Sequence, residues 1–139
     1  MTKQINLENQ VGHLLRRVFH KARNKMQKKI SATGLSPMQT AALTSLAQKG
    51  STSQNKLGRR IGMEPGNVHG LVDRLIKKGV ITSNRIEEGP GLHILDLTDK
   101  GRTIVDQVIP LGIEASKEML APLSPKEQEK FLEYLRKLL

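Results

Sequence analysis

Near position 80 the spacing of apolar residues in this chain changes from helical to extended. Before that point, apolar residues recur every three or four positions, which is typical of amphipathic helices. Residues 80–82 begin an extended run, Gly89-Pro90-Gly91 predicts a turn, and residues 93–97 are the expected returning strand of a hairpin. The helical spacing resumes after Thr98. We therefore expect a mainly α-helical chain with one small β-hairpin.

Local start and stop signals divide the first 79 residues into four expected helices. An apolar stripe predicts the first over residues 7–30, and Ser36-Pro37-Met38-Gln39 has the form of a capping box that begins the second. A cap within residues 51–54 predicts a short third helix, and Pro65 opens the fourth. The fourth helix is expected to point five apolar residues inward, namely Val68, Leu71, Val72, Leu75 and Ile76.

Two further helices are expected after the hairpin. Thr98 can cap a long helix, in which Pro110 is expected to produce a kink or a split because it removes one backbone donor. Ser124-Pro125-Lys126-Glu127 forms another capping box and begins the last helix. The sequence contains no internal repeat and no low-complexity linker, so a single domain is expected.

The charge of the chain favours a polyanionic partner for its first two thirds. The chain holds 23 Lys and Arg against 13 Asp and Glu, a formal net charge of +10. Residues 1–34 and 35–98 carry all of this excess, whereas residues 99–139 are neutral. Surface Lys and Arg can also serve only to keep a helix soluble, so both interpretations stay open at this point.

Composition excludes several classes of protein. The chain has no Cys, which rules out disulfides, thiol catalysis, thiol redox sensing and Cys-ligated zinc. Its three aromatic residues give poor support to the stacking of single-stranded bases. There is no run of 18 apolar residues and no signal peptide, so we expect a cytoplasmic protein that does not span a membrane.

A helix, a glycine-containing turn, a second helix and a hairpin together form a winged helix-turn-helix, which lays its second helix in the major groove of DNA. Five short segments, taken together in their order and spacing along the chain, carry a resemblance to a known family: Leu35-Ser36-Pro37-Met38-Gln39, Ser53-Gln54-Asn55-Lys56-Leu57-Gly58, Val72-Asp73-Arg74-Leu75, Lys78-Gly79-Val80-Ile81 and Leu97-Thr98-Asp99-Lys100-Gly101. In these segments residues 35–102 resemble the DNA-binding core of the MarR family of bacterial transcription regulators. The flanking helices also fit, so the resemblance covers essentially the whole chain.

The resemblance implies a homodimer built as a single MarR-like domain over residues 1–139. Residues 1–34 and 99–139 would form intertwined dimerisation helices, and residues 35–98 the DNA-binding core. A two-fold axis would then place two recognition helices in successive major grooves of a pseudo-palindromic double-stranded site.

Five residues early in the fourth helix, the expected recognition helix, occupy positions that face base edges in the family: Pro65, Gly66, Asn67, His69 and Gly70. Asn67 can make a bidentate contact to adenine, and His69 can donate to a guanine or a phosphate. Gly66 and Gly70 depart from the family, which more often has Ser and Arg there. The simpler interpretation of this set is a solvated helix surface.

Basic residues around this helix are candidates for phosphate contacts, which position a protein without specifying sequence: Lys56, Arg59, Arg60, Arg74, Lys77 and Lys78. Ser53, Gln54 and Asn55 complete the expected DNA surface. Arg74 could instead form an ion pair within the fold, for example with Asp73 of a neighbour.

The expected hairpin, or wing, departs further from the family. A usual wing carries Asp and Arg near its tip, whereas this chain has Glu87 and Glu88 before the turn and no Arg at the tip. Arg85 or His93 could still contact the DNA backbone. Specificity is then expected to depend on the recognition helix.

Many regulators of this family are released from DNA by a small aromatic carboxylate or phenolic compound. In this chain, four residues of the first helix could form the cationic part of such a site, above Met38 and Ala42: His13, Arg16, Arg17 and His20. A solvated basic face is the alternative for each of them. His residues at metal-ligand spacing are missing, so no metal and no cofactor are expected.

Three other classes of function explain the sequence less well. An enzyme is not expected, because the chain lacks a phosphate loop, a nucleophile elbow and paired carboxylates. A membrane-surface protein would leave the helix-turn-helix unexplained. A sequence-neutral, DNA-packaging protein without an effector accounts for the charge and stays as the alternative to a sequence-specific, ligand-responsive repressor.

Overall fold

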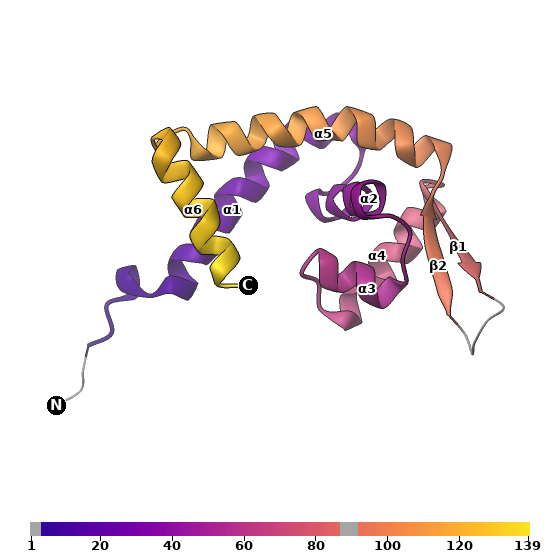
Figure 1. Ribbon diagram of the computed structural model, residues 1–139, viewed down its shortest axis with the longest axis horizontal. Coiled ribbons are helices and arrows are strands. Elements are labelled where there is room, and N and C mark those ends of the chain that lie inside the picture. The colour runs from indigo at the N-terminus through magenta and orange to yellow at the C-terminus, as the bar shows by residue number, and fades with distance from the viewer. Residues whose placement is uncertain (1–3, 87–91) are drawn as a thin grey trace. The chain divides into compact units, whose positions relative to one another are not determined.

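The computed structural model describes residues 4–86 and 92–139. Residues up to Lys29 and Gly112–Leu139 form one compact unit, and Ile30–Leu111 form a second. Figure 1 labels the helices and strands of both units. The expectation of a mainly helical chain with one antiparallel hairpin is confirmed.

The second unit contains the expected succession of short helices. They are α2 (Pro37–Lys49), α3 (Gln54–Arg60) and α4 (Pro65–Lys77), preceded by a 3₁₀ turn at Ser31–Thr33. The capping box of α2 is complete, because Ser36 Oγ accepts from the Gln39 backbone N–H and Gln39 Oε1 accepts from the Ser36 N–H, both at 3.1 Å. Each helix therefore begins where its local signal predicts.

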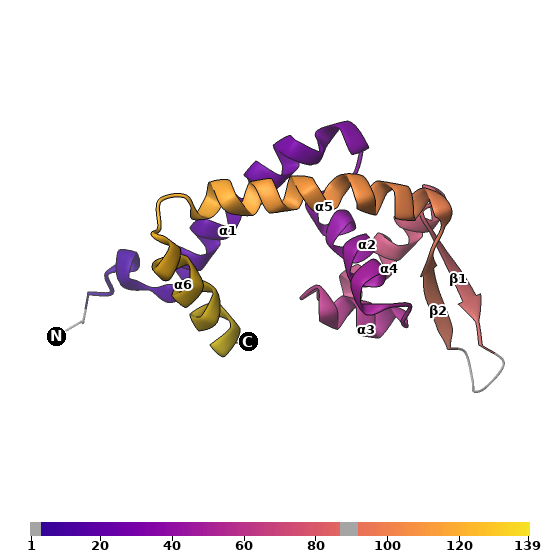
Figure 2. The ribbon, with the colours of Figure 1, turned by 45° about the horizontal axis from the view of Figure 1, so that its top comes forward.

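The hairpin consists of β1 (Ile81–Arg85) and β2 (His93–Leu97), which pair antiparallel from Ile81 opposite Leu97 to Arg85 opposite His93. The expected turn residues Gly89-Pro90-Gly91, together with Glu87 and Glu88, lie outside the described residues. Figure 2 shows the two strands side by side. Because Leu95 N donates to Thr52 O at 2.9 Å, the connection between α2 and α3 is also joined to the hairpin.

The core of the second unit lies between the helices and the inner face of the hairpin. Its largest fully buried side chains include Leu43, Leu57, Leu75, Ile81 and Leu95. Four of the five apolar residues of α4 are buried as expected, but the expectation for Ile76 is wrong, since that residue is 38% exposed. Each step along a helix turns by about 100°, so the position after Leu75 lies at the edge of the buried stripe.

Two glycines allow backbone segments to approach closely. A Cβ atom on Gly58 of α3 would lie 2.5 Å from Val68 Cγ2 of α4. A Cβ atom on Gly101 would lie 2.1 Å from the backbone oxygen of Val80. Real Cβ atoms do not approach other atoms so closely, so these positions accept no side chain without a shift of the chain.

The first unit combines α1 (Val11–Ile30) up to Lys29, the part of α5 (Asp99–Leu120) from Gly112 onward, and α6 (Pro125–Lys137). The α1 helix begins later than expected, because Leu7–Asn9 form a separate 3₁₀ turn capped by the Asn6 side chain. Of the kink or split expected at Pro110, the split is wrong, since α5 continues through this residue. Pro110 and Asp106, whose carbonyl loses its helical donor, are both exposed, and water can satisfy that carbonyl.

Within the described ranges, no helix is long and apolar enough to cross a membrane.

Lys29 links α1 to α5 in the first unit. Its Nζ atom lies 2.8 Å from Glu118 Oε1 and 3.5 Å from Glu114 Oε2. The hydrogen bond from Lys29 lowers the pKa of Glu118 and, reciprocally, raises the pKa of Lys29. Both pairs are solvent-accessible, so their contribution to stability is modest and sensitive to salt.

We expect Glu118→Gln to lower the melting temperature at neutral pH and to have less effect in acid. A carboxyl whose pKa is lowered by folding stabilises the protein above its unfolded-state pKa, near 4.5, and loses that contribution as pH falls through the folded-state pKa. Thermal unfolding at both pH values tests this, with the exposed Glu129→Gln as the matched control. An equal deficit in acid and at neutral pH would contradict the assignment.

Candidate nucleic-acid interface

The first turns of α4 present the expected reading residues at the surface. Glu64 is the N-cap residue and makes no side-chain cap bond, while Pro65 occupies the first turn. Pro65, Gly66, Asn67 and His69 are exposed. A Cβ atom on Gly66 would meet nothing within 4 Å, so packing does not require glycine there. At this end of α4 the side chains of Asn67 and His69 are therefore exposed, with open space at Gly66 between them and the start of the helix.

Gly70 lies beneath the side chain of Arg74. A Cβ atom on Gly70 would lie 3.8 Å from Arg74 Nη2 and 3.9 Å from Nη1. Helical side chains lean toward the N-terminus, so a residue four positions later covers the glycine. The Arg74 guanidinium therefore covers the space above Gly70. Asp73 Oδ2 of the same helix lies 3.6 Å from His69 Nε2.

Three of the expected DNA-contacting residues also hold the fold together. Ser53 caps α3 by accepting a hydrogen bond from the Lys56 backbone N–H at 3.3 Å. Arg60 Nη1 donates to the Gly50 carbonyl at 2.8 Å, and Lys78 Nζ donates to the Gly34 carbonyl at 2.9 Å. The cap within residues 51–54 was predicted, whereas sequence reasoning missed the bonds of Arg60 and Lys78, because each acceptor is a backbone carbonyl that no residue type reveals.

Other residues that are expected to contact phosphates do not hold the fold together through any of the described interactions. Lys56, Arg59, Lys77 and Arg85 are exposed. Gln54 and Asn55 lie at the start of α3, beside the same surface. Their contact with DNA stays a prediction.

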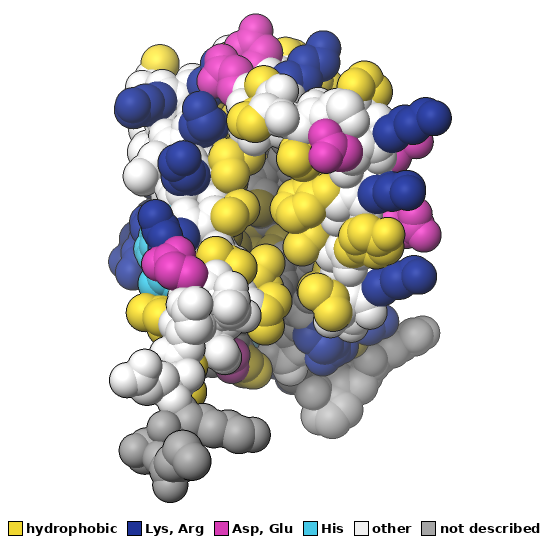
Figure 3. Space-filling view, turned by 90° about the vertical axis from the view of Figure 1, so that its left-hand side faces the viewer, with side chains coloured by type: hydrophobic (Ala, Val, Ile, Leu, Met, Phe, Trp, Pro, Cys, Tyr) yellow, Lys and Arg dark blue, Asp and Glu magenta, His cyan; other side chains and the backbone are white. Residues whose placement is uncertain are grey.

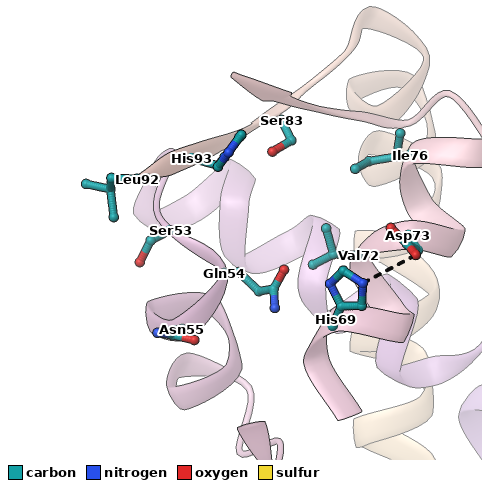
Figure 4. A pocket seen from close by; sticks show the side chains of 10 residues that line it. All are labelled: Ser53, Gln54, Asn55, His69, Val72, Asp73, Ile76, Ser83, Leu92 and His93. Carbon is teal, nitrogen blue, oxygen red and sulfur yellow. Dashed lines mark ion pairs between the residues drawn. The ribbon is translucent and has the colours of Figure 1, made fainter. Parts of the chain in front are cut away.

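A cleft of about 400 Å³ lies between α3, α4 and the hairpin (Figure 4). We call it the reading-head cleft, and its lining consists of Ser53, Gln54, Asn55, His69, Val72, Asp73, Ile76, Ser83, Leu92 and His93. The two histidines come from different elements, α4 and β2. Val72, Asp73, Ile76, Ser83 and Leu92 were absent from the expected site, and no local sequence signal places them together.

The hairpin is held in position by a side-chain contact as well as by the Thr52 bridge. Ser51 Oγ donates a hydrogen bond to Asp96 Oδ1 of β2. Ser51 lies directly before Thr52, so the side-chain and backbone contacts act at neighbouring positions. The hairpin is thereby tied to the segment that leads into α3.

We expect Asp96→Ala to speed amide hydrogen exchange in β1 and β2 while leaving the melting temperature nearly unchanged. The variant removes an exposed hydrogen bond but keeps the Thr52–Leu95 bridge, so local opening becomes easier without loss of the core. Exchange followed by mass spectrometry tests this, with Asp106→Ala on α5 as the control. Unchanged exchange in the hairpin would show that the Ser51–Asp96 contact does not hold it.

The expected effector residues fall into the two separate compact units. In the first unit, His13 Nε2 lies 3.9 Å from Glu8 Oε1 and Arg17 Nη1 lies 3.4 Å from Glu8 Oε2, whereas Arg16 and His20 are exposed. In the second unit, Met38 is half-buried and Ala42 is fully buried in the core. Their role in binding a ligand stays a prediction. In the described part of the chain, no three His, Cys, Asp or Glu residues are grouped so that they could hold a metal ion.

The order and packing of these elements define a winged helix-turn-helix protein, and comparison with known proteins agrees. The MarR family profile matches residues 35–88. The chain is 26% identical over 137 residues to the transcriptional repressor NicR of Pseudomonas putida, covering 96% of this chain and 85% of NicR.

Solved structures give the same result. A probable transcriptional regulator from Pseudomonas aeruginosa has 31% identity and a TM-score of 0.89, covering 96% of this chain and 100% of the other. BpsR of Bordetella bronchiseptica, whose DNA binding is regulated by 6-hydroxynicotinic acid, has 24% identity and a TM-score of 0.90, covering 98% and 97%. This chain belongs to the MarR family of transcriptional regulators.

Proposed function

We propose that this chain is a homodimeric repressor that binds a specific double-stranded operator and releases it when a small aromatic acid binds. The observation that carries the DNA-binding part is the exposed start of α4, where Asn67 and His69 are exposed and a Cβ atom on Gly66 would meet nothing within 4 Å. An exposed helix of this kind, flanked by a hairpin, fits the major groove of B-DNA.

The proposal of a homodimer rests on the apolar face of the first unit. Figure 3 shows apolar side chains gathered in a band that Lys and Arg side chains flank. Along α1, Leu14, Leu15, Val18 and Phe19 are 40–58% exposed, and Tyr134 of α6 is 55% exposed. Soluble monomers rarely leave so many large apolar residues uncovered. A second copy of the chain would cover them, as the family resemblance implies.

Basic residues around α4 would supply affinity without sequence information. Lys56, Arg59 and Lys77 are exposed and can each neutralise a phosphate. Because every such contact releases counterions, binding is expected to weaken steeply as salt is raised.

The effector part of the proposal has support from relatives and from charge. BpsR is regulated by 6-hydroxynicotinic acid, an aromatic acid, and NicR is a repressor of similar sequence. In this chain Arg16, Arg17 and His20 supply exposed basic groups on α1 that suit a carboxylate. Because coupling between two ligands is reciprocal, DNA should weaken binding of the acid by the same factor by which the acid weakens binding of DNA.

The experiment is a titration of aromatic acids, 6-hydroxynicotinate first, against the protein bound to a fluorescent duplex from the region upstream of its own gene. A productive effector is expected to lower affinity about 5- to 150-fold. Arg16→Gln should reduce this response, whereas Arg102→Gln on α5 should not. If no aromatic acid in the panel changes operator affinity, the effector part of the proposal is wrong and the DNA-binding part stands.

A further inference from the structure

The reading-head cleft combines an apolar wall with a set of polar groups. Val72, Ile76 and Leu92 form the apolar part of its lining. Ile76 is 38% exposed and Leu92 is 46% exposed, although both are large apolar residues. His69 and His93, together with the side chains of Gln54, Asn55 and Ser83, supply hydrogen-bonding groups around the same space (Figure 4). The cleft is also lined by the carboxylate of Asp73, beside His69. A ligand that fits this lining has an apolar part and a compact part that accepts hydrogen bonds from the imidazole and amide groups.

We propose that the cleft holds one sugar–phosphate unit of the bound DNA strand, with the deoxyribose against Ile76 and Leu92 and the phosphate between His69 and His93. The inference rests on the proposed DNA-binding function and adds to it a specific binding position for the sugar–phosphate backbone of the DNA. A protonated imidazole binds phosphate better than a neutral one, so occupation of the cleft takes up protons. DNA affinity is therefore expected to rise as pH falls.

The placement of the two histidines favours a backbone contact rather than a base contact. His69 belongs to α4, the helix that would enter the groove, and His93 belongs to β2 of the wing. A strand that runs between the helix and the wing passes both side chains. The Ser51–Asp96 and Thr52–Leu95 contacts hold the wing in place, so the two imidazoles would not need to be brought together by the DNA.

The charged groups around the two histidines influence how strongly DNA affinity depends on pH. Asp73 of α4 faces His69 Nε2 at 3.6 Å, and its carboxylate competes with phosphate for the protonated ring. Arg85 of β1 is paired in register with His93, so the two side chains lie on the same face of the hairpin. Residues 53–55 of α3 and Ser83 of β1 contribute only uncharged groups.

The test measures affinity for the operator duplex and for a scrambled duplex by fluorescence anisotropy, from about pH 5.5 to 8.5 at constant ionic strength, across the range in which His titrates. The wild-type protein is compared with the His69→Gln, His93→Gln double variant and with a Gln107→Ala control, which changes an exposed residue of α5. Both cleft histidines are exposed, so the double variant should fold, which thermal unfolding verifies.

We expect wild-type affinity to increase about tenfold from high to low pH, a coupling of ordinary size. The double variant should lose most of this increase, and its salt dependence should be shallower by about one phosphate contact. The control should behave like the wild type. Asp73→Asn should bind more tightly than the wild type, because it removes the competing carboxylate.

Two results would overturn the inference. An equal pH response in the wild type and the double variant would do so while leaving specific DNA binding intact. Failure of the wild type to prefer the operator at any pH would remove the proposed function itself. A specific loss of DNA affinity when inorganic phosphate replaces chloride at equal ionic strength, absent in the double variant, would support the inference, because free phosphate would compete with the DNA phosphate for the same position.

Discussion

Replacement of Asn67 by alanine is expected to weaken binding to the preferred duplex by about 1–3 kcal/mol and to relax sequence preference at one position of each half-site. Asn67 is exposed in the first turn of α4, and an asparagine amide there can contact adenine through two hydrogen bonds. Alanine removes both bonds and keeps the helix. Anisotropy titrations against the preferred duplex and against single-base variants measure the effect.

Lys56→Ala is the matched control for the Asn67 prediction. Lys56 is exposed on α3 and would contact a phosphate, so its loss should lower affinity nearly equally on all duplexes and make the salt dependence shallower. If Asn67→Ala lost as much affinity on random DNA as on the preferred site, Asn67 would not be reading a base.

Substitution of Gly58 by alanine is expected to reduce the free energy of unfolding by about 1–3 kcal/mol. The added Cβ atom would lie 2.5 Å from Val68 Cγ2, at the contact between α3 and α4. Both residues are buried, so the two helices must move apart to relieve the overlap. Chemical denaturation of the wild type and the variant measures the loss.

A double-mutant cycle shows whether the overlap causes the loss. Val68→Ala removes the methyl group that the new Cβ would meet, so the Gly58→Ala, Val68→Ala protein should be more stable than the sum of the two single losses predicts. Gly12→Ala on α1 is the control, since a Cβ there meets nothing within 4 Å and should not destabilise. Strict additivity in the cycle would contradict the steric explanation.

Much of the fold could be predicted, because its boundaries are set by local chemistry. The capping boxes at Ser36 and Ser124 and the proline at position 65 act within one turn of helix, so the sequence alone locates the starts of these helices. Ile76 and Pro110 differ from expectation for another reason. Ile76 lies at the edge of the buried stripe of α4 and is 38% exposed, and the tolerance of Pro110 depends on exposure of the carbonyl that loses its donor.

The candidate site could be predicted only in part from the sequence. Exposure of Asn67 and His69 follows from the amphipathic pattern of α4, which local spacing reveals. The reading-head cleft depends instead on packing of the hairpin beside α3 and α4, which brings His93 to the same space as His69. Arg60 and Lys78 likewise donate hydrogen bonds to backbone carbonyls of distant turns, and the residue types in the sequence do not predict such partners.

The most direct test of the central claim, that this chain is a sequence-specific DNA-binding regulator, is its affinity for the DNA upstream of its own gene. The comparison is a scrambled duplex of equal length, measured at two salt concentrations. We expect a preference of about 10³ or more, which is typical of specific regulators, with affinity that falls as salt rises. Equal affinity for both duplexes, with the same steep dependence on salt, would contradict the claim and indicate a protein that binds the DNA backbone without reading its sequence.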